Sequence, residues 1–389
     1  MSEKVLNILL DKRIDSNNSN EVLDKLNGII NDSDKETVEL DANELEYISS
    51  AGLRVLLTIR KKSGKTIRII NVSSEVYEIF DVTGFNQLLD VSKKMREISV
   101  EGCEIIGSGF CGNVYRIDPE TIVKVYENEA ADSLEDIENE KRMAKIALVG
   151  GIPTAISYDI VKVGNHYGSV FELLKAKSFN SLIVQNTDDA ETITKKFVDF
   201  LKQIHETEIV NPLLLPAKDK FVKYLDEIKS YLSEGLYSLL KKMVLAIKDS
   251  DHVVHGDPQM KNIMMVDGDP MLIDMDTLCS GEPIFDLQAL YVTYMAFGED
   301  DPENSMNFLG IKKELATSIW NWILNYYYED KTEEERGIIL DKICVLAYIR
   351  FMYIIVTSSL KDGDLGKLQI KHSVEKLNAL SEKYKDVNI

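Results

Sequence analysis

The chain has 389 residues, 44% hydrophobic and 28% charged, which is typical of a soluble protein with two or three cores. Its net charge of −20 argues against a nucleic-acid interface or an anionic membrane surface, because both need a basic face. Four scattered cysteines form no CxxC pair, and the N-terminus lacks the pattern of a secretory signal. We therefore expect a cytoplasmic protein that binds neither nucleic acid nor membrane.

The first ~95 residues alternate strand and helix patterns, which predicts an α/β domain. Strands are predicted at three places: Lys4–Leu10, Thr37–Leu40 and Thr66–Val72. Apolar residues at helical spacing predict three helices between and after them, containing Val22–Ile30, Leu53–Leu57 and Val76–Phe80. The charged stretch Ser92–Glu97 is the best domain boundary, which divides the chain into residues 1–97 and 98–389.

The second domain changes pattern twice. Residues 98–174 show short strands around glycines and one helix, and a long helical region follows from about Ala190. This order predicts an α+β domain with a small β-rich lobe, residues 98–174, and a larger, mainly helical lobe, residues 175–389.

A glycine-rich run opens the small lobe. Gly107, Gly109 and Gly112 form a GxGxxGxV pattern, which is also found in dinucleotide-binding units that start a helix at the glycines. Here two predicted strands follow instead, turning at Asp118–Glu120, and the second carries Lys124 among apolar residues. Lys124 could be an edge-strand charge. After a glycine-rich loop, it better fits a lysine that neutralises the α- and β-phosphates of a nucleotide.

Such a lysine needs a carboxylate partner from a helix. Glu140 falls on the apolar stripe of the predicted helix Ser133–Leu148, and a carboxylate on an inward stripe is costly unless it is paired. We expect Glu140 to pair with Lys124, whereas Glu138 points elsewhere and is solvated.

The segment His255-Gly-Asp257-Pro-Gln-Met-Lys-Asn262 has the HxDxxxxN spacing of a kinase catalytic loop. Asp257 is the candidate catalytic residue and Asn262 a candidate Mg²⁺ ligand. A predicted hairpin turning at Asp267–Asp269 then delivers Asp274, the second candidate ligand, because carboxylate oxygens suit Mg²⁺. Asp276 points the same way, but we favour Asp274 because it follows the apolar run directly.

Two further residues of this region are expected to be structural. His255 is interpreted as a hydrogen-bonded brace of the loop rather than a reacting group. Asp286, in Pro283-Ile-Phe-Asp286-Leu, is predicted to accept backbone hydrogen bonds beneath the loop.

From Ile98 onward the sequence resembles the aminoglycoside phosphotransferase and choline kinase branch of the kinase-like fold. The resemblance rests on His255-Gly-Asp257 and on Ile273-Asp-Met-Asp276, and its specific motifs end near Leu287. It implies ATP and Mg²⁺ as cofactors and a small-molecule hydroxyl as acceptor. It also implies that the backbone of the hinge from Glu172 to Leu174 holds adenine.

Residues from about 3 to 95 resemble a STAS domain, the fold of anti-sigma factor antagonists. The resemblance rests on Val38–Asp41 and Tyr47–Leu57, and it implies an anti-sigma-type protein partner. In that family the serine matching Ser50 is phosphorylated, and a phosphate there would lie at a helix N-terminus, which favours anions. The family often has Asp where Ser49 stands. Ser50 could equally serve as the helix cap, and both interpretations stay open.

The leading hypothesis is a small-molecule kinase with a STAS domain for regulation or docking. A protein kinase that phosphorylates a STAS serine, its own or a partner's, and a nucleotide-binding interaction module are the alternatives. Aromatic and acidic residues could line the acceptor pocket and suit an amine, although such residues more often belong to the core or to a solvated face. They are Trp320, Trp322, Tyr326, Tyr327 and Glu299–Glu303.

Overall fold

The computed structural model describes residues 5–109, 111–128 and 133–384. Lys4, in the first predicted strand, and Phe110, in the glycine-rich run, lie outside them. The chain forms two compact units: Met1–Ser99 with Ile160–Asn165, and Val100–Asp159 with His166–Ile389. The boundary predicted after Glu97 lies two residues before the end of the first of these segments.

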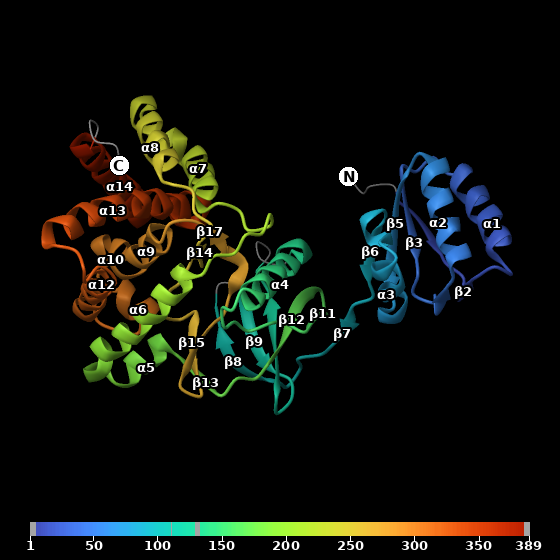
Figure 1. Cartoon of the computed structure of the whole chain (residues 1–389), viewed down its shortest axis with the longest axis horizontal. Coiled ribbons are helices and arrows are strands. Elements are labelled where there is room, and N and C mark those ends of the chain that lie inside the picture. The colour runs from blue at the N-terminus through green and yellow to red at the C-terminus, as the bar shows by residue number, and fades with distance from the viewer. Residues whose placement is uncertain (1–4, 110, 129–132, 385–389) are drawn as a thin grey trace. The chain divides into compact units, whose positions relative to one another are not determined.

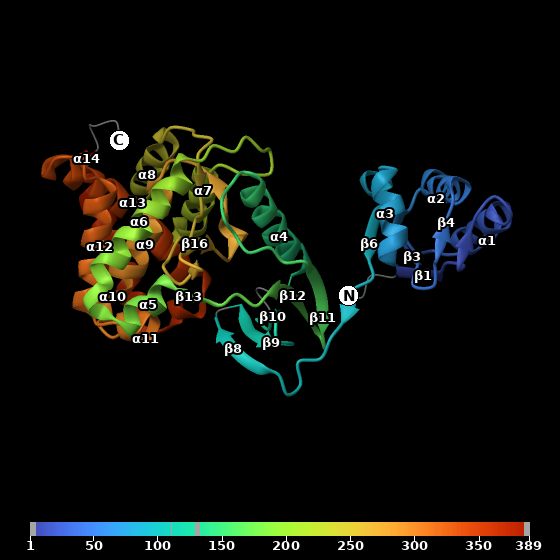
Figure 2. The same cartoon turned by 60° about the horizontal axis from the view of Figure 1, so that its bottom comes forward.

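The first unit is an α/β domain built on a parallel sheet of strand order β1-β3-β5-β6. Figure 2 shows its three helices on one side of this sheet. Its elements are β1 (Val5–Leu9), β2 (Arg13–Ile14), α1 (Ser19–Asn31), β3 (Thr37–Asp41), β4 (Tyr47–Ile48), α2 (Ser50–Ser63), β5 (Thr66–Val72), α3 (Ser74–Val82), η1 (Phe85–Gln87), β6 (Asp90–Lys93) and β7 (Arg96–Glu97).

The core of this unit lies between the helices and the sheet. Val22, Leu26 and Ile30 recur at helical spacing on α1 and are all buried, as are Val38 and Leu40 on alternate positions of β3. The helical spacing on α1 and the alternation on β3 therefore mark the two surfaces that pack together in the core. The three predicted strands and three predicted helices are present.

Among the glycines of this unit, Gly52 is the one that has no room for a Cβ atom. A Cβ atom at Gly52 would lie 2.6 Å from the carbonyl oxygen of Ile14 and 2.7 Å from the side chain of Ile48. These two residues end the short parallel pair β2–β4, against which the first turn of α2 packs. A residue without a side chain is therefore needed at this turn.

The second unit begins with an antiparallel sheet of order β12-β10-β9-β8, covered by one helix (Figure 1). Its elements are β8 (Glu104–Ser108), β9 (Gly112–Arg116), β10 (Thr121–Tyr126), α4 (Leu134–Val149), β11 (Asp159–Val163), and β12 (His166–Glu172). The hairpin β9–β10 turns at Asp118–Glu120 as predicted, with Ile117 N donating to Thr121 O. The β11 residues Ile160–Val163 group with the first unit, in which β7 pairs with β11 in parallel.

The rest of the second unit is a mainly helical lobe with two short sheets, β13-β15-β16 and β14-β17. Its elements are β13 (Ala176–Ser178), α5 (Phe179–Gln185), η2 (Thr187–Asp189), α6 (Ala190–Glu206), α7 (Ala217–Ile228), η3 (Lys229–Tyr231), α8 (Glu234–Ala246), β14 (Val253–Val254), β15 (Ile263–Val266), β16 (Asp269–Leu272), η4 (Met275–Thr277), β17 (Cys279–Ser280), α9 (Ile284–Tyr291), the π-helix η5 (Val292–Ala296), α10 (Phe297–Asp300), α11 (Asn304–Leu309), α12 (Lys313–Tyr327), α13 (Glu333–Thr357), η6 (Ser359–Asp362) and α14 (Asp364–Tyr384). Among the described residues, no helix is long and apolar enough to cross a membrane.

Gly52 and Gly28 provide a matched test of the first unit. Gly52→Ala should destabilise it by roughly 1–3 kcal/mol, because the new methyl group meets backbone. Gly28→Ala, in an open position of α1, should instead stabilise it by about 0.5–1 kcal/mol. Hydrogen exchange of β1, β3 and β5 in the full chain measures both effects, and slower exchange in Gly52→Ala would contradict the packing described.

Candidate active site

The loop that follows β14 is fixed by a buried carboxylate. Asp286, fully buried at the start of α9, accepts hydrogen bonds from the backbone nitrogens of His255 (2.8 Å) and Gly256 (2.6 Å). The prediction that Asp286 accepts backbone hydrogen bonds beneath the loop is confirmed. Gly256 has a positive φ of 86°, and a Cβ there would lie 2.5 Å from Thr277 O. Both constraints favour glycine at this position.

Asp286 is itself held by a second layer of polar contacts. The Nε2 atom of His205, on α6, lies 2.9 Å from Asp286 Oδ2, and its Nδ1 atom lies 2.6 Å from the hydroxyl of Tyr327. Because an ionised carboxylate only accepts, His205 donates through Nε2. Burial alone would raise the pKa of Asp286. The hydrogen bond and charge of His205, together with the backbone hydrogen bond from His255, lower that pKa below its ordinary value.

His255 braces the loop from inside, as predicted. Its Nδ1 atom accepts from the backbone nitrogen of Asp257 at 3.3 Å, and its Nε2 atom lies 3.2 Å from Ile273 O. The first contact assigns the proton to Nε2, which then donates to the carbonyl. His255 thus connects the loop to the end of the hairpin β15–β16.

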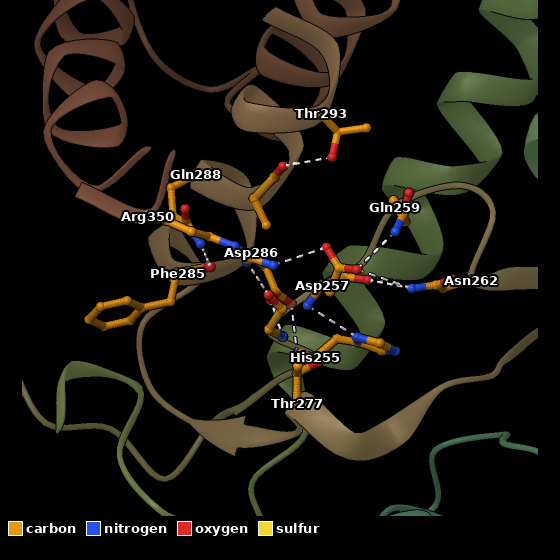
Figure 3. A network of polar contacts seen from close by, with 12 residues as sticks. His255, Asp257, Gln259, Asn262, Thr277, Phe285, Asp286, Gln288, Thr293 and Arg350 are labelled. Carbon is orange, nitrogen blue, oxygen red and sulfur yellow. Dashed lines mark hydrogen bonds and ion pairs between the residues drawn. The ribbon is translucent and has the colours of Figure 1, made fainter. Parts of the chain in front are cut away.

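Asp257 receives three side-chain donors. Gln259 Nε2 donates to Oδ2 at 2.8 Å, and Asn262 Nδ2 donates to the backbone oxygen at 3.0 Å and to Oδ2 at 3.4 Å. Arg350 on α13 donates to Oδ1 at 3.2 Å and, through its other terminal nitrogen, to the carbonyl oxygen of Gly256. Figure 3 shows these donors surrounding the carboxylate of Asp257.

Arg350 is the main site residue that the sequence analysis missed. Its contacts with Gly256 and Asp257 join residues more than ninety positions apart in the chain, so no local motif contains them. The available signal was its position as a single cation in the apolar stretch Ile343–Leu360. Such a charge needs a buried partner.

Lys124, on β10, lies between two carboxylates. Its Nζ atom is 3.4 Å from both carboxylate oxygens of Glu140, on α4, and 2.6 Å from Oδ1 of Asp274. The predicted pairing of Lys124 with Glu140 is therefore present. Burial would lower the pKa of Lys124, but the two carboxylates outweigh it and raise that pKa above its usual range. The hydroxyl of Tyr126 donates to Glu140 Oε2 at 2.9 Å.

Asp274 and Asp276 differ in their surroundings. Asp274 ends the hairpin with a left-handed backbone (φ 65°) and contacts Lys124. The side chain of Asp276 reaches solvent, although the surrounding protein covers most approaches to its carboxyl group. Burial of its carboxyl group, together with the charges of Asp274 and Glu140, raises the pKa of Asp276 to about 7. Direct contact with Lys124 supports the choice of Asp274 over Asp276.

The residues present fit a magnesium ion. Asn262 has its amide nitrogen bound to Asp257, so its amide oxygen is left as a ligand atom. Asp274 adds a carboxylate whose Oδ1 contacts Lys124 and whose other oxygen can bind a metal. Amide and carboxylate oxygens are the hard ligands that Mg²⁺ prefers, usually with waters and substrate phosphates completing the shell.

The three glycines of the run lie where β8 ends and β9 begins. Gly109 N donates to Gly112 O at 2.9 Å, and a Cβ at Gly112 would lie 2.1 Å from Val125 O, so Gly112 lets the turn pack on β10. A Cβ at Gly109 would meet no atom within 4 Å, and at Gly107 only Val114 at 3.6 Å. Packing therefore excludes a side chain at Gly112 but not at Gly107 or Gly109.

The hinge follows β12. Leu173 N donates to Glu120 O at 2.7 Å. This bond anchors the residue between Glu172 and Leu174 to the turn of the β9–β10 hairpin.

Several residues considered for an acceptor pocket are engaged elsewhere. Trp320 is buried against Tyr291, and Tyr327 bonds His205. Tyr326 donates to the exposed Glu191, and Glu299 accepts from Tyr348. The structure therefore assigns these side chains to packing and surface contacts, as their helical spacing also allowed.

Ser50 is not the cap of α2. The helix begins at Ser50, and the preceding Ser49 has the extended backbone of an N-cap, with its Oγ accepting from Ala51 N at 3.2 Å. The cap interpretation for Ser50 is therefore wrong, because only the residue before the first helical one can reach that nitrogen. Ser50 is exposed, and Arg54 Nε lies 3.3 Å from its carbonyl oxygen.

Comparison with known proteins agrees with this geometry. The family model described as "Phosphotransferase enzyme family" matches residues 102–309, which is more than half of the chain. The chain belongs to this family. It is therefore a phosphotransferase of the kinase type. A second model, described as "Mlab, STAS domain", matches residues 2–90, so the phosphotransferase carries a STAS-like domain at its N-terminal end.

Similar solved structures include the GDP complex of a wild-type aminoglycoside 2′-phosphotransferase, with 13% identity, 79% of this chain and 98% of that chain covered, and a TM-score of 0.44. A choline/ethanolamine kinase family protein from Mesorhizobium loti has 14% identity, 73% and 89% coverage, and a TM-score of 0.45. A search of curated protein sequences gave no match.

Replacing Asp286 tests the support beneath the loop. Asp286→Asn should destabilise the phosphotransferase domain by roughly 2–3 kcal/mol, because an amide cannot accept all three hydrogen bonds. Since the folded pKa of Asp286 is lowered, its contribution is present above about pH 3.8 and is lost as the pH falls through the folded value. The gap between wild type and variant in urea denaturation should therefore persist at neutral pH and narrow in acid.

The control is Asp199→Asn, an exposed carboxylate on the same helix as His205. It should change stability by less than about 0.5 kcal/mol. Equal stability of the two variants at neutral pH would contradict the role assigned to Asp286.

Proposed function

We propose that the phosphotransferase uses Mg·ATP to phosphorylate a hydroxyl group of a small molecule, with Asp257 as the catalytic residue. The observation that carries the proposal is the contact of Lys124 Nζ with both Glu140 and Asp274, beside the loop that holds Asp257 and Asn262. A lysine placed among carboxylates, on the strand that follows the glycine-rich run and its β-strand, suits phosphate binding.

Each residue has a separate task in this proposal. Lys124, held by Glu140, neutralises the α- and β-phosphates beneath the turn of Gly107, Gly109 and Gly112. The backbone of Glu172 and Leu174 holds adenine. Asn262 and Asp274 would hold Mg²⁺, which when bound offsets negative charge on the phosphates.

Asp257 acts on the hydroxyl group of the acceptor. Its carboxylate accepts the proton of the acceptor hydroxyl as the oxygen of that hydroxyl attacks the γ-phosphorus, and ADP leaves with the broken bond's electron pair. The guanidinium group of Arg350 lies 3.2 Å from the Asp257 carboxylate and forms an ion pair with it. The four cysteines are free, which supports a reducing, cytoplasmic compartment where ATP is available.

The STAS-like domain supports a regulatory or docking role, with an anti-sigma-type protein as partner. A second candidate function, protein phosphorylation, is favoured by Ser50. It is exposed on the first turn of α2, beside Arg54. A phosphate there would lie at the N-terminus of the helix, beside a cation.

Thermal shift and turnover together test the main proposal. Mg²⁺ with a non-hydrolysable ATP analogue should stabilise the full chain, by about 2.7 kcal/mol at one hundred times Kd. Asp257→Asn should keep this stabilisation and lower phosphotransfer at least about a hundredfold, measured as ADP release with pooled sugars, amines and other alcohols.

Asp274→Ala is the contrasting variant, and it should lose the Mg²⁺-dependent part of the stabilisation. An equal loss of nucleotide affinity in Asp257→Asn and Asp274→Ala would show that the roles are wrongly assigned. A wild-type chain that Mg·ATP does not stabilise would refute the nucleotide site itself.

The STAS proposal is tested on Ser50. After incubation with Mg·ATP, mass spectrometry should find phosphate on Ser50 and none in Ser50→Ala, with Ser49→Ala as the matched neighbour that keeps it. The rate per chain should rise with protein concentration if one chain phosphorylates another. An unmodified Ser50 in a chain that consumes ATP would leave the domain a docking element.

A further inference from the structure

Arg350 is an unusual residue for its place in the helix. Its α13 neighbours Ile349, Phe351 and Met352 are almost completely buried, and its own side chain is only 15% exposed. Placing a guanidinium group there carries a desolvation cost that an apolar side chain would avoid. Packing of α13 therefore gives no reason for an arginine, and the reason must lie in what the guanidinium contacts.

The two contacts of Arg350 are with consecutive residues of the catalytic loop. One terminal nitrogen donates to the carbonyl oxygen of Gly256, and the other donates to Oδ1 of Asp257 at 3.2 Å. Figure 3 shows the guanidinium reaching from its helix to the loop. Its planar fork thus fixes the backbone before Asp257 and the carboxylate itself in one geometry.

The remaining donors to the carboxylate leave Oδ1 to Arg350. Gln259 and Asn262, both on the loop, donate to Oδ2. Hydrogen bonds to one oxygen alone restrict rotation of the carboxylate about its Cβ–Cγ bond less than bonds to both oxygens do. A donor on the other oxygen stops the rotation, and a charged donor makes the stronger hydrogen bond.

We propose that Arg350 is a positioning residue that orients the Asp257 carboxylate toward the acceptor hydroxyl. The inference rests on the proposed function, because it takes Asp257 as the residue that accepts the proton. Arg350 touches neither nucleotide nor acceptor in this role. Its effect is the alignment of Asp257, and misplacement of a catalytic group by about 1 Å can cost roughly a hundredfold in rate.

The alternative is that Arg350 merely clips α13 to the loop. If the contact is only structural, its loss should lower stability and nucleotide affinity. If Arg350 is a positioning residue, its loss should lower kcat. Asp257 remains 26% exposed, so loss of its partner does not leave a fully buried charge. The two roles are therefore separable by experiment.

The experiment measures Mg²⁺-dependent ADP release by the full chain, with pooled alcohols as acceptors. Arg350→Ala should lower kcat about ten- to a hundredfold and leave the KM for ATP within about twofold. The kcat of Arg350→Lys should lie between those of the wild type and Arg350→Ala, because a lysine can make one of the two contacts but not both. Guanidinium ion, kept far below denaturing concentrations, should restore part of the activity of Arg350→Ala but none of that of Asp257→Asn.

Arg336 is the matched control. It lies on the same helix, is also partly buried and also donates to two carbonyl oxygens, those of Tyr328 and Lys331, but none of these contacts involves the catalytic loop. Arg336→Ala should leave kcat within about twofold, with or without guanidinium. A matching fall in kcat for both arginine variants would show a general effect on α13 and overturn the proposal.

The outcomes separate the two levels of inference. A wild-type chain without Mg²⁺-dependent ADP release refutes the proposed function, and the role of Arg350 falls with it. An active wild type with unchanged kcat in Arg350→Ala overturns the role of Arg350 alone. So does a loss that appears in the KM for ATP and is not restored by guanidinium. If Arg350→Ala does not fold, Arg350→Lys decides by the same readouts.

Discussion

The site depends on the ion pairs that Lys124 forms with two carboxylates. A lysine surrounded by protein is stable as a cation only if carboxylates lie close to it, and here they come from two different places in the chain. Glu140 belongs to the helix of the small lobe, and Asp274 follows a hairpin of the large lobe, 150 residues from Lys124. One ammonium group therefore ties the sheet, the helix and the candidate metal ligand together.

This arrangement also explains how the site can stay assembled without a nucleotide. Lys124 and Asp274 neutralise each other at 2.6 Å, so neither is left as an unpaired charge in the cleft. In the proposed function, the phosphates of the nucleotide and a divalent cation would offer each partner an equivalent charge of the right sign. The exchange of one set of ion pairs for another costs less than exposing new charges would.

The catalytic loop rests on a different kind of support. Asp286, His205 and Tyr327 form a buried chain of hydrogen bonds that ends on the loop backbone, and Arg350 approaches the same loop from α13. Each of these four groups belongs to a different helix, in the order α9, α6, α12 and α13. A site on a loop becomes rigid in this way, because several packed helices fix its peptide groups.

The sequence predicted those parts of the site that follow one another along the chain. The glycine run, Lys124, Glu140, the HxDxxxxN loop and the hairpin to Asp274 have spacings that chemistry dictates, so their order alone indicated the fold. His205, Tyr327 and Arg350 could not be predicted in the same way, because each meets the loop from a distant helix. The sequence pattern also could not identify the N-cap of α2, because Ser49 and Ser50 both suit that position and only backbone geometry distinguishes them.

The most direct test of this account is a crystal structure of the full chain with Mg²⁺ and a non-hydrolysable ATP analogue. We expect Lys124 Nζ to leave its 2.6 Å contact with Asp274 for the phosphates while it keeps Glu140, and we expect Asp274 and Asn262 to bind the metal. Asp257 should remain bound to Arg350 and face the γ-phosphate. A nucleotide bound in this cleft with the Lys124–Asp274 pair intact, or a nucleotide bound elsewhere, would contradict it.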